Sequence, residues 1–100
     1  MILYNVTIGV DREIETTWVK WMKETHIPDV LNTGIFVGHK FYKVLSQEDE
    51  HTASYCIQYF TQSIEQFNRY LKEHAPGLIE EHRRMFKDRH VAFRTLLEEV

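Results

Sequence analysis

The chain has 100 residues, of which 43% are apolar and 27% charged, as is typical of one globular domain. We expect this domain to span residues 1–100. The composition excludes a disordered tail or a coiled-coil rod. The net charge of −3 gives no reason to expect a nucleic-acid partner, and no apolar run approaches the roughly 20 residues that cross a membrane. Cys56 is the single cysteine and the N-terminus lacks the features of a signal peptide, so we expect a cytoplasmic protein without nucleic-acid or membrane partners.

The first half of the chain predicts a strand, a helix and a second strand. Residues 2–10 alternate between two sets of side chains, one of them wholly apolar, as in a strand with one buried face. Asp11 stands where a helix cap belongs, and apolar residues then recur at intervals of three and four. Pro28 should bend or end this helix near His26. The alternating residues 36–45 predict the second strand.

The second half repeats this pattern in the order strand, helix, strand. The polar residues 46–52 predict an exposed connection, and the alternating residues 52–60 predict the third strand. Ser63 can cap a second helix, and Pro76 fits the first turn of a further helical segment. Residues 90–97 alternate again. The order β-α-β-β-α-β predicts a ferredoxin-like α+β fold, a four-stranded antiparallel sheet with its helices on one face.

The sheet face that the helices leave open predicts an interface. We expect the more apolar set of strand residues, which includes Tyr4, Ile57 and Phe93, to lie under the helices. The other set is too apolar for a fully hydrated surface and too polar for a dry core, as is common at interfaces between subunits. We therefore expect a homodimer in which two open faces meet; a monomer with one hydrated face is the alternative. The expected interface residues are Leu3, Asn5, Thr7, His39, Phe41, Gln58 and Arg94.

His26 is the best candidate for a catalytic residue. It lies near the end of a helix that carries two tryptophans, beside the bend expected at Pro28, where a gap could open between helix and sheet. Histidine titrates near neutral pH and could accept or donate a proton there. The alternative is a histidine that bonds to free carbonyls at the helix end.

Aromatic side chains could line a small apolar pocket between the first helix and the sheet. The candidate ligand-binding residues are Tyr4, Trp18, Trp21, Tyr55 and Tyr59, although such residues can equally well fill a core. A functional pocket should have a volume of at least a few hundred Å³.

Motifs for other chemistries are missing from the sequence. It contains no His-Glu-x-x-His or Cys-x-x-Cys pattern, no Gly-x-Ser-x-Gly and no glycine-rich phosphate loop, so we expect no metal and no cofactor. Residues 83–94 concentrate five positive charges against one negative charge. This segment supports an alternative function, a non-catalytic homodimeric module that binds an acidic protein partner.

Several motifs of the chain look familiar together: Met1 to Thr7, Trp21-Met22, His26 to Leu31, Gln58-Tyr59, His74-Ala75-Pro76 and Val91 to Glu99. They resemble a small bacterial family, the DUF4286 domain of unknown function. The resemblance covers nearly the whole chain and implies a dimeric α+β barrel. It implies no established activity.

More distantly, a tryptophan-bearing helix that ends in His-x-Pro resembles the EthD-type proteins of the same superfamily. That similarity implies a pocket between helix and sheet, with His26 in contact with the ligand, and monooxygenase-like or isomerase-like chemistry. The sequence shows no pattern that pairs His26 with a second histidine or with an Asp–His partner, so it does not indicate one reaction. We therefore expect a homodimeric protein that binds a small apolar or aromatic ligand beside His26.

Overall fold

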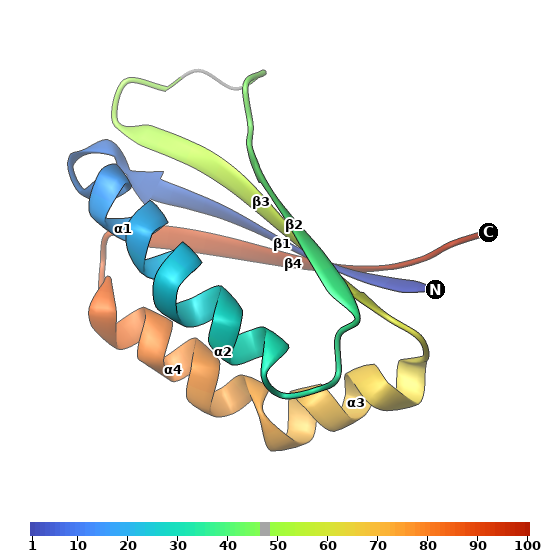
Figure 1. The fold of residues 1–100 in the computed structure, drawn as a ribbon. Helices are drawn as coiled ribbons and strands as arrows, with labels where there is room; N and C mark the ends of the chain where they lie inside the picture. The colour runs from blue at the N-terminus through green and yellow to red at the C-terminus, as the bar shows by residue number, and fades with distance from the viewer. Residues whose placement is uncertain (47–48) are drawn as a thin grey trace.

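The computed structural model describes residues 1–46 and 49–100, and within them it has the ferredoxin-like fold that the sequence predicts (Figure 1). One antiparallel sheet of four strands runs in the order β2-β3-β1-β4, and the helices cover one of its faces. The strands are β1 (Ile2–Asp11), β2 (Gly38–Lys43), β3 (Thr52–Thr61) and β4 (His90–Glu98). The helices are α1 (Glu15–Trp21), α2 (Ile27–Leu31), α3 (Ile64–Glu73) and α4 (Ala75–Met85). Residues 47 and 48 of the expected 46–52 connection lie outside the described part.

The two central strands, β1 and β3, form the floor of the core. They pair over their full lengths, with Tyr4 opposite Tyr59 and Val6 opposite Ile57. Every second residue of both strands is buried beneath the helices, as their alternating sequence predicts. Tyr59 and its neighbours therefore project from the sheet into the layer between sheet and helices.

The first helical segment continues through Pro28 instead of ending at it. A single π-helical turn (Met22–His26) joins α1 to α2, and the Ile27 N–H bonds to the Met22 carbonyl five residues back. Proline lacks an N–H, so the backbone before it can widen without losing a hydrogen bond at that position. The expected bend near His26 is thus a widened turn, and it places His26 at the junction of α1 and α2.

The second helical segment breaks where the sequence predicts. The Ser63 hydroxyl caps α3 by accepting a hydrogen bond from the Gln66 N–H at 3.2 Å. His74 leaves helical geometry, and Pro76 lies in the first turn of α4. The break lets α3 and α4 follow the sheet in two different directions (Figure 1).

Three residues that we expected on the open face lie on the opposite, helix-covered face, and that expectation is wrong. His39 pairs with Tyr59 and Phe41 with Ile57, so both share the face of these two buried residues. Arg94 pairs with Val6 and also faces the helices.

The expected position of Phe93 beneath the helices is wrong for the same reason. Both sets of alternating residues in β4 contain apolar side chains, so the pattern shows which residues share a face but not which face is buried. The register with β1 decides it: Phe93 pairs with Thr7, on the open face, and Phe93 is 68% exposed.

The open face carries more apolar surface than the expected set of residues provides. Leu3, Asn5, Thr7 and Gln58 do lie there, since they alternate with the buried residues of β1 and β3. Val91 and Phe93 of β4 add large apolar side chains that are 59% and 68% exposed. No helix of the described residues is long and apolar enough to span a bilayer.

Candidate functional site

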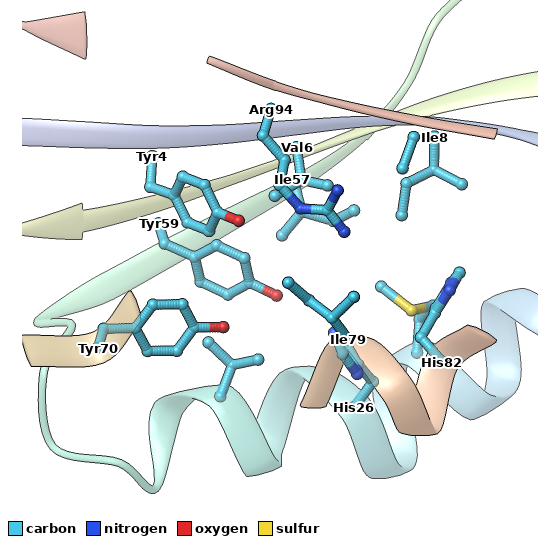
Figure 2. A pocket seen from close by; sticks show the side chains of 13 residues that line it. Tyr4, Val6, Ile8, His26, Ile57, Tyr59, Tyr70, Ile79, His82 and Arg94 are labelled. Carbon is cyan, nitrogen blue, oxygen red and sulfur yellow. The ribbon is translucent and has the colours of Figure 1, made fainter. Parts of the chain in front are cut away.

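A cleft lies between the helix-covered face of the sheet and the helices above it (Figure 2). Its enclosed volume is about 30 Å³, and the unfilled space counted out to its open mouth is about 440 Å³. The enclosed part is smaller than the pocket we expected and has room for one water molecule. Its lining side chains come from the strands β1, β3 and β4, from the helices α2, α3 and α4, and from the π-helical turn.

His26 forms one wall of the cleft. Its Nδ1 atom is buried and has no hydrogen-bond partner among the described residues. The ring stacks on Trp21, with 5.2 Å between ring centroids. Burial lowers the pKa of His26 to about 4, so the imidazole is neutral at neutral pH. His26 therefore presents to the cleft a neutral imidazole, which is a weak base until an anion forms beside it.

Three tyrosines from three elements line the cleft opposite His26. Tyr4 belongs to β1, Tyr59 to β3 and Tyr70 to α3. In Figure 2 their hydroxyls point in the same direction, toward the side where Arg94 and His26 lie. Burial raises the pKa of each of the three, so they remain O–H donors. None of these hydroxyls donates a hydrogen bond to another group of the described protein.

Arg94 extends from β4 over the same cleft (Figure 2). Its charge opposes the effect of burial on the pKa of Tyr4 and of Tyr70, and its hydrogen bond to the Tyr4 hydroxyl adds to this effect on Tyr4. The same charge helps to lower the pKa of His26. Among the described residues, no carboxylate lies within salt-bridge distance of its guanidinium. Arg94 and Ile79 are the exposed members of the lining, so these two side chains stand at the mouth.

The other end of the helix–sheet layer is a filled core. Trp18 is 0% exposed, and its indole N–H donates to His82 Nε2 at 3.0 Å. His82 packs between Trp21, Phe86 and the His90 ring, and it also lines the cleft, so it stands at the boundary between the filled core and the cleft. Burial lowers the pKa of His82 to about 3, which keeps the ring neutral and able to accept this hydrogen bond.

The five expected ligand-binding residues divide between these two ends. Tyr4 and Tyr59 line the cleft. Trp18 lies in the filled core, and Trp21 lies behind His26. Tyr55 contacts Trp18, and its hydroxyl donates to Glu15 at 2.5 Å, away from the cleft lining.

Sequence reasoning missed Tyr70, Arg94 and His82 as lining residues. Tyr70 follows the apolar spacing of its helix and looks like an ordinary core residue, and His82 looks like one of six similar histidines. No sequence signal marks Arg94 as a lining residue, because the alternation in β4 shows which residues share a face but not which face is buried.

The basic residues of segment 83–94 do not form one surface. Arg83 pairs with Glu80 at 2.7 Å, Arg89 pairs with Asp11 at 2.9 Å, and Arg94 faces the cleft. This arrangement gives no support to binding of an acidic partner through that segment. Within residues 1–46 and 49–100, no group of three or more His, Cys, Asp or Glu side chains is placed to hold a metal ion.

The fold and the cleft define a ferredoxin-like α+β protein with a side-chain-lined space between helices and sheet. The chain belongs to the DUF4286 family, a domain of unknown function, whose match covers residues 1–100. No functionally curated protein matches the sequence.

Solved structures share the fold at low sequence identity. An EthD family protein from Bacillus halodurans is 11% identical with a TM-score of 0.71, and the match covers all of both chains. A dimeric ferredoxin-like protein from an uncultured marine organism is 18% identical with a TM-score of 0.71, over 100% of this chain and 95% of that one. SnoaB, a cofactor-independent oxygenase from Streptomyces nogalater, is 14% identical with a TM-score of 0.60, over 99% and 93%. At these identities the likeness concerns the fold.

Proposed function

We propose that the cleft binds a small aromatic ligand and that His26 accepts a proton from it. The observation that carries the proposal is the buried Nδ1 atom of His26, which has no partner in the described protein and belongs to a residue that lines the cleft. A buried polar atom without a partner destabilises the fold, and a ligand that donates a hydrogen bond to it removes that penalty.

The shape of the lining favours an aromatic ligand. Flat tyrosine rings form one side, while Val30, Ile57 and Ile79 supply apolar contacts. The enclosed volume must grow for a ring system to enter. Rotation of the two exposed side chains at the mouth, Arg94 and Ile79, would join the enclosed space to the wider opening.

Proton abstraction is the reaction class that this geometry supports. A C–H or O–H bond of the ligand breaks, the proton goes to the imidazole, and the electron pair remains on the ligand as an anion. Return of a proton to another carbon completes an isomerisation. Transfer of an electron from the anion to dioxygen begins an oxygenation without a cofactor, the activity that SnoaB's description gives for that protein. The developing anion next to His26 also raises the affinity of the imidazole for the proton.

A titration with 2-naphthol, followed by the naphtholate absorbance and by the NMR signals of Trp21 and His26, tests the proposal. We expect saturable binding with shifts at both residues. His26→Gln should weaken binding about tenfold and remove the naphtholate signal. His51→Gln, on an exposed turn, is the matched control and should leave both unchanged.

A second variant covers the case in which His26→Gln fails to fold. Ile79→Trp at the exposed mouth should block entry and leave the circular dichroism spectrum unchanged. Full binding of 2-naphthol to the Ile79→Trp variant, or none to the wild type, would overturn the proposal.

We also propose that the protein acts as a homodimer whose open sheet faces meet. The exposed Val91 and Phe93 side chains support it, since exposed apolar surface of this kind marks interfaces between proteins. Leu3, Asn5, Thr7 and Gln58 share this face. A neighbour in fold is described as dimeric. In this dimer the cleft of each subunit lies on the side away from the partner.

A further inference from the structure

Four groups that can donate hydrogen bonds line the cleft. They are the hydroxyls of Tyr4, Tyr59 and Tyr70 and the guanidinium of Arg94. The Nδ1 atom of His26 is also buried there without a partner in the described protein. A site with several donors, one of them charged, is complementary to a group that accepts several hydrogen bonds.

Arg94 differs from Arg83 and Arg89, two other arginines of segment 83–94. Arg83 and Arg89 each hold a carboxylate, at 2.7 Å and 2.9 Å, and both stand on the outer surface. Arg94 faces the helices from the middle of β4, and no carboxylate of the described residues lies within salt-bridge distance of it. A guanidinium without a carboxylate partner can bind an anion, and its forked N–H groups match two oxygens of one group.

The tyrosines cannot supply that anion. Burial raises the pKa of Tyr59 and of Tyr70, so these phenols stay protonated at any physiological pH. Their O–H groups point to the side where Arg94 stands (Figure 2). The four donors come from β1, β3, α3 and β4, so each is held by a different element.

We infer that the ligand of this cleft carries an anionic oxygen, a carboxylate or a phenolate, which Arg94 and the tyrosine hydroxyls bind while its ring lies between sheet and helices. This inference rests on the proposed function, since it names the class of ligand for the same cleft. A carboxylate arrives as an anion, whereas a phenol becomes one by giving its proton to His26.

The test compares three probes of one ring size: 2-naphthoate, 2-naphthol and 2-naphthalenemethanol, each titrated by NMR and calorimetry at pH 7. We expect the wild type to bind 2-naphthoate about tenfold or more tightly than the alcohol. Arg94→Gln should abolish this difference by weakening the binding of 2-naphthoate about tenfold or more. Arg84→Gln, an exposed arginine of α4, is the matched control and should keep the preference.

The probes also separate the two sources of the anionic oxygen. Tight 2-naphthoate binding with no naphtholate signal from 2-naphthol identifies a carboxylate, and a naphtholate signal that depends on both His26 and Arg94 identifies a phenolate. Tyr59→Phe should weaken the binding of 2-naphthoate a few-fold more than that of the alcohol, whereas a general loss of structure would weaken both alike.

Equal affinities of the wild type for 2-naphthoate and the alcohol, or a preference that survives Arg94→Gln, would overturn the inference. In that case, the proposed function would still stand if the wild type bound the alcohol and the Ile79→Trp variant did not. Failure of all three probes to bind would overturn both.

Discussion

The two ends of the helix–sheet layer contain the same kinds of residue and differ in whether their polar atoms have partners. At one end, the indole of Trp18 is fully buried and donates to His82 at 3.0 Å. At the other end, Tyr59 and Tyr70 are buried, but their hydroxyls donate to no group of the described protein. Aromatic content alone therefore does not distinguish a core from a binding site. A buried polar atom without a partner does, and His26 Nδ1 is the one found among the described residues, because a core excludes such atoms unless a ligand or water completes them.

The largest expected effect is at the filled end. Trp18→Ala removes a fully buried side chain and leaves His82 Nε2 without its donor, so we expect the free energy of unfolding to fall by about 3–5 kcal/mol. Urea denaturation followed by circular dichroism measures it. A fall of less than about 1 kcal/mol would mean that this end is as loosely packed as the cleft, and the contrast between the two ends would be lost.

The buried histidines should make stability depend on pH. The pKa of His26 is about 4 and that of His82 about 3 in the folded protein, against about 6.5 in an unfolded chain. Below pH 6.5 the unfolded chain takes up protons that the folded protein does not, so stability is lost as the pH falls. Each histidine contributes up to about 1.4 kcal/mol per pH unit, and together they should remove about 3 kcal/mol between pH 7 and pH 5.

Urea denaturation at a series of pH values measures this slope. Carboxylates with lowered pKa values, such as Asp11 and Glu15, add to the loss mainly below pH 5, so the window from 5 to 6.5 reports on the histidines. His26→Gln should halve the slope in that window, and the exposed control His51→Gln should leave it unchanged. If the slope of His26→Gln equals that of the wild type, the imidazole of His26 in the wild type is exposed to water.

A substitution on the open face should separate assembly from the cleft. Phe93→Glu puts a charge on a side chain that is 68% exposed in one subunit and would be buried between two, so we expect the dimer to weaken about 100-fold or more. Sedimentation velocity at micromolar concentration measures the shift to monomer. Affinity for 2-naphthol should stay within about twofold, because the cleft lies on the opposite side of the sheet. A wild-type protein that sediments as a monomer would contradict the proposed dimer.

The smallest expected effect is at the open end of the layer. Tyr70→Phe removes a hydroxyl that donates to nothing in the described protein, so the free energy of unfolding should change by less than about 0.5 kcal/mol. The comparison with Trp18→Ala is made under the same conditions. A loss above about 1 kcal/mol would show that this hydroxyl already has a partner, and the cleft would have fewer free donors than we infer.

Most of the fold could be predicted from local patterns. The caps at Asp11 and Ser63 are confirmed by their hydrogen bonds to Glu13 and Gln66, because capping depends on neighbouring residues only. The order of strands and helices is also confirmed. It could be predicted because the periodicity of each element is a local property of its sequence. The effect of Pro28 was predicted only in part: a missing N–H can end a helix or widen one turn, and packing of the following residues against the core selected the wider turn.

The candidate site was less accessible to sequence reasoning. Residues 26 and 59 could be chosen because a bend and an aromatic strand are local features, while Tyr70 and Arg94 join them only through the packing of α3 and β4. Nothing near Arg94 in the sequence distinguishes it from the basic residues around it.

The amino-acid sequence alone determined which side chains share a face of each strand and helix, because side-chain direction follows from the repeat of the backbone. Only the tertiary structure decided which of those faces turns toward the helices in β2 and β4, because that depends on hydrogen-bonded register with β3 and β1. The orientation of β4 brings Arg94 to the cleft and leaves Phe93 for a partner.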